Sequence, residues 1–394
     1  MVAQGNGQTG AGGRAPLSAI LFILFSMELA GRMAVQLALD SRGVPLFVVS
    51  MSTTMCWVGS LIGGVLWGRL SDKHDARWLL PGVILGATAS IGILAMGLPT
   101  SAVLSMSFIR LLALSGSMPI AMAMISRGAS LGRRGRDLSG LSSSRSIGGV
   151  VGLMAGGLLL QSTGFHGTFT VLAAWSSLAL VLAILSYRTW GIALARTPAR
   201  RLPRPRIAVH RLLWATTLRQ MAIVGTSSLI FVYMQKLSIR ADWMGGISAL
   251  NPAMQVLAFL LFGRWADRFG RRRIFLFGFV LSSVAPMIYA LASNTAHMAI
   301  GFLIHGTAFG AQYIGSAAYI GDVTPRGSQG MMFGLYQASF ALGGIAGPLL
   351  SGAIATHVGL RPMLWAMAAI AILGALLAST QPVHRAEVQD PPPA

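Results

Sequence analysis

The sequence predicts an all-α membrane protein that crosses the bilayer many times. Of its 394 residues, 54% are hydrophobic and only 10% are charged, and the mean hydropathy is +0.68. Soluble domains carry about 25% charged residues, so this composition excludes an ordinary soluble enzyme. The apolar runs are continuous and long enough for membrane helices of about 20 residues, whereas the strands of a transmembrane barrel alternate in polarity.

Apolar runs bounded by charged residues, Gly or Pro predict twelve transmembrane helices in two sets of six. The first set lies near 17–38, 44–68, 78–98, 101–126, 140–161 and 165–188, and the second near 212–236, 241–264, 272–293, 296–320, 328–354 and 358–380. We therefore expect a disordered tail (1–16), an N-terminal six-helix bundle (17–189), a Pro- and Arg-rich linker (190–211), a C-terminal six-helix bundle (212–381) and a second tail (382–394).

The basic residues are distributed unevenly between the two sides of the predicted membrane. Of 30 Lys and Arg residues, only Arg42, Lys236, Arg240 and Arg361 fall in loops on one side, and most of the others lie in the loops and linker of the opposite side. Because cytoplasmic loops carry the excess of basic residues, we expect both termini in the cytoplasm. The net charge of +20 then reflects topology and contact with the lipid bilayer, not nucleic-acid binding. The preponderance of Arg over Lys indicates a bacterial inner membrane.

Two loops in corresponding halves of the chain share a pattern. The loop after the second span contains Gly68, Asp72, Lys73 and Arg77, and the loop after the eighth contains Gly263, Asp267, Arg268 and Arg271. Gly68 and Gly263 are 195 residues apart, as are Asp72 and Asp267. The pattern predicts two parallel six-helix repeats related by an axis along the membrane normal, with the substrate path between them.

The two loops resemble the G-x-L-x-D-R-x-G-R-R signature of the major facilitator superfamily, and the resemblance covers essentially the whole chain. The first copy has Asp75 and Ala76 where the family has Gly and a basic residue, and the second has Trp265 in place of Leu. The resemblance implies the major facilitator fold, and it implies that the loops are charged latches that hold the halves together on the cytoplasmic side when the protein faces outward. Alternatively, their basic residues only set the topology.

Glycines recur at helical spacing in the fifth and eleventh spans and predict close helix packing. The residues are Gly148, Gly152 and Gly156 in the fifth span, and Gly343, Gly347 and Pro348 in the eleventh, which the same offset of 195 relates to the fifth. The fifth span is similar to the family's antiporter motif G-x-x-x-G-P-x-x-G-G, except that Leu153 stands in place of Pro.

One acidic residue, Glu28, lies deep inside a predicted span, while the other acids fall in loops, tails or span ends. Arg32 and Gln36 follow at intervals of one turn, so the three share a stripe. A charge in hydrocarbon costs several kcal/mol unless it faces a cavity or a partner, and we therefore expect the stripe to face a central cavity. Glu28 either exchanges protons or contacts a cationic substrate group, or it forms a static pair with Arg32.

Arg110 in the fourth span resembles the buried arginine of the family's R-x-x-Q-G motif, although Ala113 and Leu114 replace Gln and Gly. Because arginine keeps its proton in proteins, Arg110 is expected to tune the charge of Glu28, bind an anion, or act as a structural hydrogen-bond donor. Arg145 and Arg219 lie nearer the cytoplasmic span ends, where they are expected to snorkel.

Further polar and aromatic residues are candidates for the lining of the substrate cavity, although helix packing is an alternative for each of them. The candidates are Trp57, Tyr233, Asn251, Gln255, His305, Gln312, Tyr313, Tyr336 and Gln337, in addition to Glu28, Arg32, Gln36 and Arg110. His305 lies 195 residues after Arg110 and so occupies the corresponding position of the second repeat.

These features predict a secondary transporter that alternates access to a site between the two halves. The G-x-G-x-x-G match at residues 5–10 lies in a polar tail with no strand before it, and the chain lacks P-loop and hydrolase motifs. Its single cysteine, Cys56, excludes intramolecular disulfides and cysteine-based zinc sites. We therefore expect no enzyme activity, cofactor or metal, and a monomer that uses the proton as its coupling ion.

The buried acid together with Arg110 resembles the twelve-helix drug:proton antiporters, which implies export of small amphiphilic compounds. The alternatives are a proton-coupled symporter or efflux carrier for a sugar, amino acid or organic anion, and, from a different class, a membrane enzyme or non-transporting receptor on the same scaffold.

Overall fold

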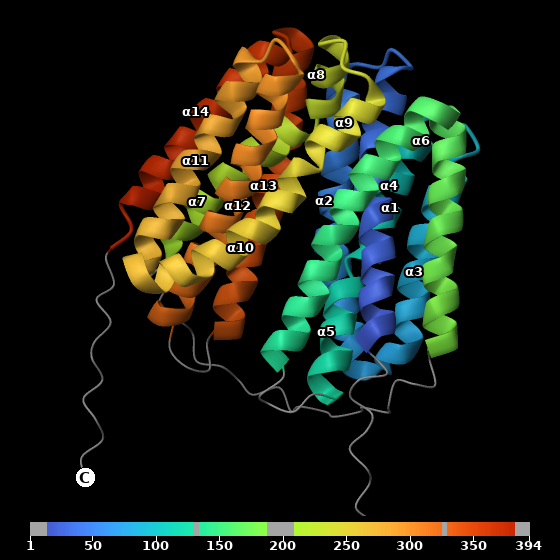
Figure 1. Ribbon diagram of the computed structural model, residues 1–394, viewed down its shortest axis with the longest axis horizontal. Helices are drawn as coiled ribbons and strands as arrows, with labels where there is room; N and C mark the ends of the chain where they lie inside the picture. Colours follow the sequence, from blue (N-terminus) through green and yellow to red (C-terminus); the bar gives the residue numbers. More distant parts are fainter. Residues whose placement is uncertain (1–13, 129–133, 187–208, 325–328, 383–394) are drawn as a thin grey trace, which may run out of the picture.

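The computed structural model describes residues 14–128, 134–186, 209–324 and 329–382, and the secondary structure in these ranges is helical, without strands. Figure 1 shows the helices standing side by side in two groups, α1–α6 and α7–α14. Nine helical stretches of the described chain are long and apolar enough to cross a membrane. The expected linker and both tails lie almost entirely outside the described residues.

The first bundle contains six helices in chain order. They are α1 (Arg14–Asp40), α2 (Leu46–Lys73), α3 (Ala76–Leu94), α4 (Thr100–Leu114), α5 (Ser117–Gly128) and α6 (Arg134–Leu185). The predicted fourth span is divided between α4 and α5. The predicted fifth and sixth spans both fall in α6, which turns back at Gly164, where φ is 66°. A positive φ is strained for residues with a side chain, so glycine suits this bend.

The second bundle contains eight helices because two of its predicted spans are each divided into two. Its helices are α7 (His210–Ser227), α8 (Ile230–Lys236), α9 (Ala241–Ser248), α10 (Leu250–Phe269), α11 (Arg271–Leu291), α12 (Thr295–Val323), α13 (Gln329–His357) and α14 (Leu360–Ser379). The predicted seventh span corresponds to α7 with α8, and the eighth to α9 with α10.

The packing of the helices repeats with the same offset as the sequence. A Cβ placed on Gly148 or Gly152 of α6 would collide with the backbone of Phe22 or Ser26 of α1. In the second bundle, a Cβ on Gly343 or Gly347 of α13 would collide with the backbone of Thr217 or Met221 of α7. Both the glycines and their partners are related by 195 positions. The glycines therefore let α6 approach α1 and α13 approach α7 in equivalent ways, as small residues do in membrane helix pairs.

The two bundles touch at the end of the molecule where α1 finishes and α2 begins, which we call the α1–α2 end. The amide of Phe47 donates a hydrogen bond to Thr356 Oγ1 at 2.9 Å, and Gln36 Nε2 donates one to the carbonyl of Ser227 at 3.0 Å. Thr54 Oγ1 donates to the carbonyl of Ile345 at 3.3 Å. All three bonds join residues of different bundles.

Two close backbone crossings complete this contact. Ideal Cβ atoms on Gly157 and Gly245 would each lie 3.0 Å from the other residue's Cα, so α6 and α9 meet there without side chains. On the other side of the molecule, a Cβ on Gly352 of α13 would lie 2.9 Å from the Cα of Phe47 and 3.0 Å from the Cβ of Ser50, both on α2. The offset of 195 converts Gly157 into Gly352 and Ser50 into Gly245, so the two crossings are equivalent.

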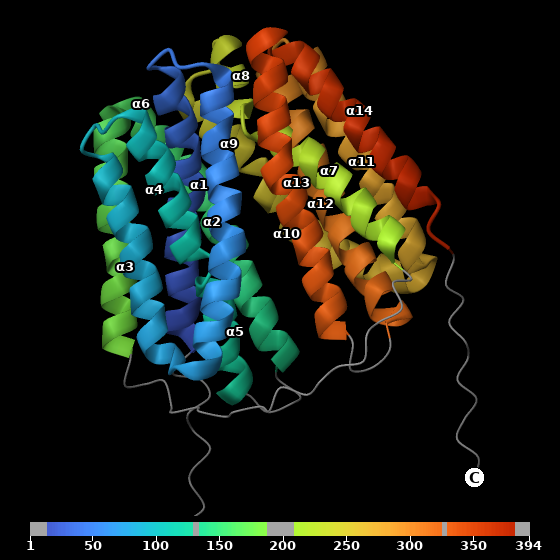
Figure 2. The same cartoon turned by 180° about the vertical axis from the view of Figure 1, so that it is seen from behind.

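At the opposite end, where α2 finishes and α3 begins, the bundles diverge. We call this the α2–α3 end. Figures 1 and 2 show α5 and the start of α6 separated from the lower parts of α10 and α13 in both views. A Cβ added to Gly64, Gly68 or Gly263 would meet no atom within 4 Å. Gly68 and Gly263 therefore make no close helix contact in this conformation.

Candidate functional site

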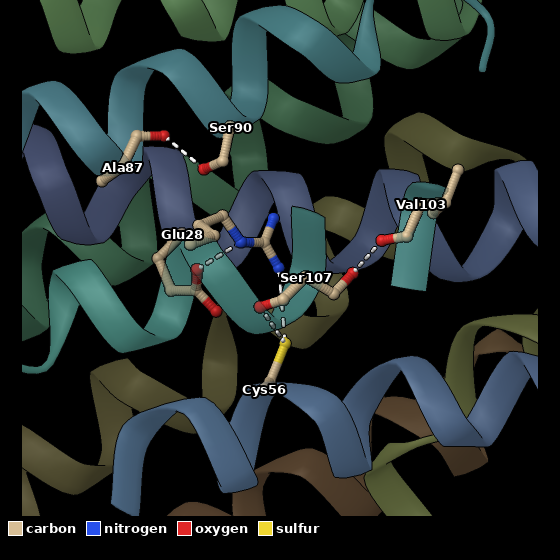
Figure 3. Close-up of polar contacts among 7 residues, drawn as sticks. Glu28, Cys56, Ala87, Ser90, Val103 and Ser107 are labelled. Atoms are coloured by element: carbon tan, nitrogen blue, oxygen red, sulfur yellow. Dashed lines mark hydrogen bonds and ion pairs between the residues drawn. The ribbon is translucent and has the colours of Figure 1, made fainter. Parts of the chain in front are cut away.

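Glu28, near the middle of α1, forms an ion pair with Arg110 of α4. The Glu28 Oε2 to Arg110 Nε distance is 3.2 Å, and the two side chains are 8% and 1% exposed. The Arg110 guanidinium contacts both the Glu28 carboxylate and the thiol of Cys56, two groups that Figure 3 labels. The static pair of Glu28 with Arg32 that the sequence suggested is therefore wrong for this conformation, because the partner comes from another helix.

Arg110 occupies a confined position with few hydrogen-bond partners. Its Nη2 donates to Cys56 Sγ at 3.7 Å, and that thiol donates to the carbonyl of Ser107 at 3.6 Å. Its Nη1 is buried without a hydrogen-bond partner. A Cβ on Gly31 would lie 2.8 Å from this Nη1, so glycine at position 31 leaves room for the guanidinium. The free-energy cost of burying an arginine with unsatisfied donors depends strongly on its one carboxylate partner.

Arg32 and Arg145 lie on the face of the first bundle that looks toward the second. Arg32 is half-buried and Arg145 exposed, and neither has an acidic partner among the described residues. Arg145 Cζ lies 4.3 Å from the ring centroid of Phe25 of α1. Arg145 is also close enough to Tyr313 of α12 to interact with it electrostatically, and Arg32 is similarly close to His305 of α12. Both arginines therefore face the space between the bundles.

Arg219 of α7 is fully buried, so the expected snorkelling is wrong for this residue. Its Nε donates to Ser282 Oγ at 2.8 Å and its Nη1 to Gln220 Oε1 at 3.3 Å, while Nη2 is buried without a partner. The guanidinium lies 5.6 Å from the ring centroid of Phe309, a distance typical of cation–π contacts. His305, also buried, is close enough to Arg219 to interact with it electrostatically.

Aromatic side chains of α10, α12 and α13 form one continuous cluster in the second bundle. Its members are Phe259, Phe309, Tyr313, Tyr336 and Phe340, with neighbouring ring centroids 5.1–6.5 Å apart. Phe309 and Tyr313 are stacked at 5.6 Å with an interplanar angle of 17°. Both of these rings are half-buried, so part of their surface stays accessible.

The other predicted lining residues are distributed over several environments. Gln312 is buried and donates to Tyr336 Oη at 3.0 Å, and Gln255 donates to Asn251 Oδ1 at 2.6 Å. Trp57 of α2 packs across the bundles against Gly344, and Gln337 is exposed.

Tyr233 forms hydrogen bonds within its own bundle. It is buried in α8 near the α1–α2 end, where its hydroxyl donates to the carbonyl of Ala292 at 3.2 Å.

The predicted latch residues of the second loop connect helices within their own bundle. Arg271, at the start of α11, forms an ion pair with Asp322 of α12 and a second, at 3.9 Å, with Asp267 of α10, whose side chain is 77% exposed. Lys73 and Arg268 are exposed. The side chain of Asp72 lies outside the described residues. The halves are thus parted where the latch residues lie.

The first loop has a different local structure because Asp75 replaces Gly. Asp75 caps the N-terminus of α3 by accepting from the amide of Arg77 at 3.0 Å, and its carboxylate also pairs with the Arg77 guanidinium. The corresponding residue of the second loop, Gly270, has φ of 91°, which glycine tolerates and Asp does not favour. Asp75, which departs from the family signature, therefore acts as the N-terminal cap of α3.

Removal of the Arg271–Asp322 pair is expected to have a small effect on stability. Both side chains are about one-third exposed or more, and such pairs contribute about 0–1 kcal/mol because water and ions screen them. Asp322→Asn should therefore change the thermal unfolding temperature little more than Asp242→Asn, which removes a pair with Arg240 at the opposite end. A much larger decrease in the unfolding temperature, measured by scanning calorimetry, would show that the pair stabilises the fold more than its exposure indicates.

The sequence did not indicate that Cys56 and Gly31 belong to the Glu28–Arg110 site. Both residues contact Arg110 because of how α1, α2 and α4 are placed relative to one another. The spacing of a cysteine or a glycine along the sequence does not predict such a contact. An unpaired cysteine in an apolar run reads as core, as most buried cysteines are.

Comparison with known proteins identifies similar chains. The family model described as Major Facilitator Superfamily matches residues 17–250 and 212–394. The chain is 29% identical over 331 residues to the MFS-type transporter YuxJ of Bacillus subtilis, covering 79% of this chain and 82% of that protein. It is 24% identical over 308 residues to the multi-drug resistance efflux pump PmrA homolog of Lactococcus lactis, covering 75% of each.

Solved structures show the same fold at low sequence identity. The crystal structure of the nucleoside transporter NupG superposes with a TM-score of 0.76 at 13% identity, covering 94% of this chain and 98% of that one. At this identity the likeness supports the arrangement of the helices and nothing about the compound bound.

Proposed function

Because this chain belongs to the Major Facilitator Superfamily, we propose that it is a secondary active transporter that exports small amphiphilic compounds in exchange for protons. A multi-drug efflux pump is among the relatives that match three quarters of the chain. The observation that carries the proton coupling is the buried Glu28–Arg110 pair. Ionisable groups inside membrane proteins commonly mark ion or proton pathways.

The pair offers a simple way to exchange a proton for a compound. When Glu28 accepts a proton its charge disappears, and Arg110 keeps its charge in a site with few other acceptors. A buried charge that loses its partner is costly by about 3–5 kcal/mol. Protonation of Glu28 therefore changes the relative stability of any two conformations that solvate Arg110 differently, and this difference couples the proton to bundle movement.

Alternating access would move the contact between the bundles from one end to the other. Here the contact lies at the α1–α2 end, where hydrogen bonds of Gln36, Phe47 and Thr54 and two glycine crossings join the bundles. In the opposite conformation these contacts would open and the two loops at the α2–α3 end would meet. Gly68 and Gly263, which face open space in this conformation, would then allow the close approach for which their sequence pattern is suited.

We place the α2–α3 end in the cytoplasm of a bacterium, with both termini on that side of the inner membrane, because its loops carry most of the basic residues. The described conformation is then open toward the cytoplasm. Such a state is the one that an exporter uses to collect its compound.

Purified protein reconstituted in liposomes with a pH-sensitive dye inside tests this proposal. With an outward-directed gradient of a transported amphiphile, a proton exchanger acidifies the lumen as the compound leaves, at a rate that scales with protein content. Movement of the compound without proton movement would reject the coupling. Movement of both in the same direction would identify a symporter instead.

A further inference from the structure

We propose that the exported compound is an aromatic organic anion, whose charged group is bound by Arg32 and Arg145 and whose ring lies against Phe309 and Tyr313. This inference rests on the proposed function, since it names the class of compound for the same central site. The site would lie between the bundles, with its cationic part on α1 and α6 and its aromatic part on α12.

The first argument is the balance of charge between the bundles. Among the described side chains, Glu28 is the acid near the middle of the membrane-spanning helices, and Arg110 is paired with it. Arg32 and Arg145 have no acidic partner within the described ranges, and Arg219 has only the neutral acceptors Ser282 and Gln220. A cationic compound would add to this surplus of positive charge. An anion would reduce it, because a cleft lined by charges of one sign concentrates ions of the other sign.

The second argument is that the two arginines are available. The Arg145 side chain is exposed, its Cζ lies 4.3 Å from the ring centroid of Phe25 on α1, and Tyr313 of the opposite bundle lies within electrostatic range. Arg32 is half-buried, on the same side of α1 as Glu28 and Gln36, and near His305 of α12. Guanidinium groups bind carboxylate, sulfonate-like and phosphate-like oxygens through paired N–H donors.

The third argument is the character of the opposite wall. Phe309 and Tyr313 are stacked and half-buried, and Arg145 lies within electrostatic range of Tyr313. Aromatic rings of a ligand gain from offset stacking or edge contacts with such side chains. A compound with its anionic group at Arg145 therefore has a ring-binding surface within reach on α12.

The charge of the compound has a consequence for transport. Exchange of one outgoing monovalent anion for one incoming proton moves two positive charges inward per cycle, whereas exchange of a neutral compound moves one. Transport of the anion should therefore respond more steeply to an interior-negative potential, imposed with potassium and valinomycin, than transport of its neutral analogue.

Three naphthalene probes of matched shape test the class of compound by binding alone. They are 2-naphthalenesulfonate, 2-naphthalenemethanol and 2-naphthylmethylammonium, measured by equilibrium dialysis against the full-length protein in nanodiscs. We expect the sulfonate to bind at least tenfold more tightly than either of the others. Arg32→Gln and Arg145→Gln should each weaken sulfonate binding about tenfold while leaving the alcohol within about twofold. Arg264→Gln, at an exposed arginine of α10, is the matched control and should leave all three unchanged.

Equal binding of the three probes, or equal effects of the Arg264→Gln control and the two central variants, would overturn the inference. The binding result is independent of coupling, so the two proposals fail separately. Tight, arginine-dependent sulfonate binding without proton movement in liposomes would reject the exchanger and keep the anion site. Proton-coupled movement of 2-naphthylmethylammonium without sulfonate binding would keep the exchanger and reject the anion site.

Discussion

Replacement of Glu28 by Gln is expected to reduce substrate-driven proton movement at least a hundredfold. The amide keeps the size of the side chain but does not take up or release a proton near neutral pH. The transporter therefore loses the group that carries the proton. Exchange of labelled for unlabelled compound across the membrane should persist, because that reaction requires movement of the loaded protein and no proton release. The measurement is dye-detected proton flux beside isotope exchange in the same liposomes.

The same substitution leaves Arg110 buried without its carboxylate, so a loss of folded protein has to be separated from a loss of coupling. A pair of variants makes this distinction. Arg110→Gln combined with Glu28→Gln removes both charges and should recover most of the stability that Glu28→Gln alone loses, since replacing a whole buried pair is far less costly than breaking it. Proton movement should stay absent in the double variant.

Asp242→Asn is the acid-to-amide control, because Asp242 pairs with Arg240 near the α1–α2 end. It should retain proton movement. Full coupling in a well-folded Glu28→Gln protein would show that another group carries the proton.

The Glu28–Arg110 pair shows what the sequence could and could not predict about the site. Helical spacing placed Glu28, Arg32 and Gln36 on one stripe, and the cost of a charge in hydrocarbon made Glu28 a functional candidate. Spacing suggested Arg32, one turn away, as a static partner, whereas the resemblance of Arg110 to a buried arginine of the family suggested Arg110 as one of the groups that tune the charge of Glu28. The actual partner is on α4, from which the Arg110 side chain reaches α1 where Gly31 leaves room for the guanidinium. Contacts between helices that are distant in the chain carry no periodic signal.

The glycines illustrate the same limit for the fold. The offset of 195 residues predicted equivalent helices in two halves, and the structure shows equivalent partners for Gly148 and Gly343. Within α6, however, Gly152 packs against α1 of its own bundle, whereas Gly157 packs against α9 of the other. Both are glycines in one apolar run, so composition does not distinguish a permanent contact from one that transport would open. That distinction depends on the relative position of the bundles.

Substitution of Gly245 by Leu is expected to reduce transport at least tenfold by preventing closure of the α1–α2 end. A Cβ at Gly245 would collide with the carbonyl oxygen of Leu153 and lie 3.0 Å from the Cα of Gly157. These are backbone atoms that cannot rotate away, and forced overpacking costs about 1–3 kcal/mol or more. The contact is between bundles, so the cost falls on the conformation described here, and each bundle should still fold. The protein should then favour the conformation that is open at the α1–α2 end.

Gly246→Leu is the matched control, because a Cβ on this neighbouring residue of α9 meets no atom within 4 Å. It should transport like the parent. Closure is measured in the Cys56→Ser background with cysteines replacing Phe47 and Thr356, whose amide and hydroxyl are hydrogen-bonded at 2.9 Å across the bundles. A short bifunctional thiol reagent should crosslink this pair in the parent and in Gly246→Leu, and several-fold less in Gly245→Leu. Normal crosslinking and transport in Gly245→Leu would mean that the close crossing of α6 and α9 is not needed for closure. If transport requires this crossing, a leucine there must reduce both crosslinking and transport activity.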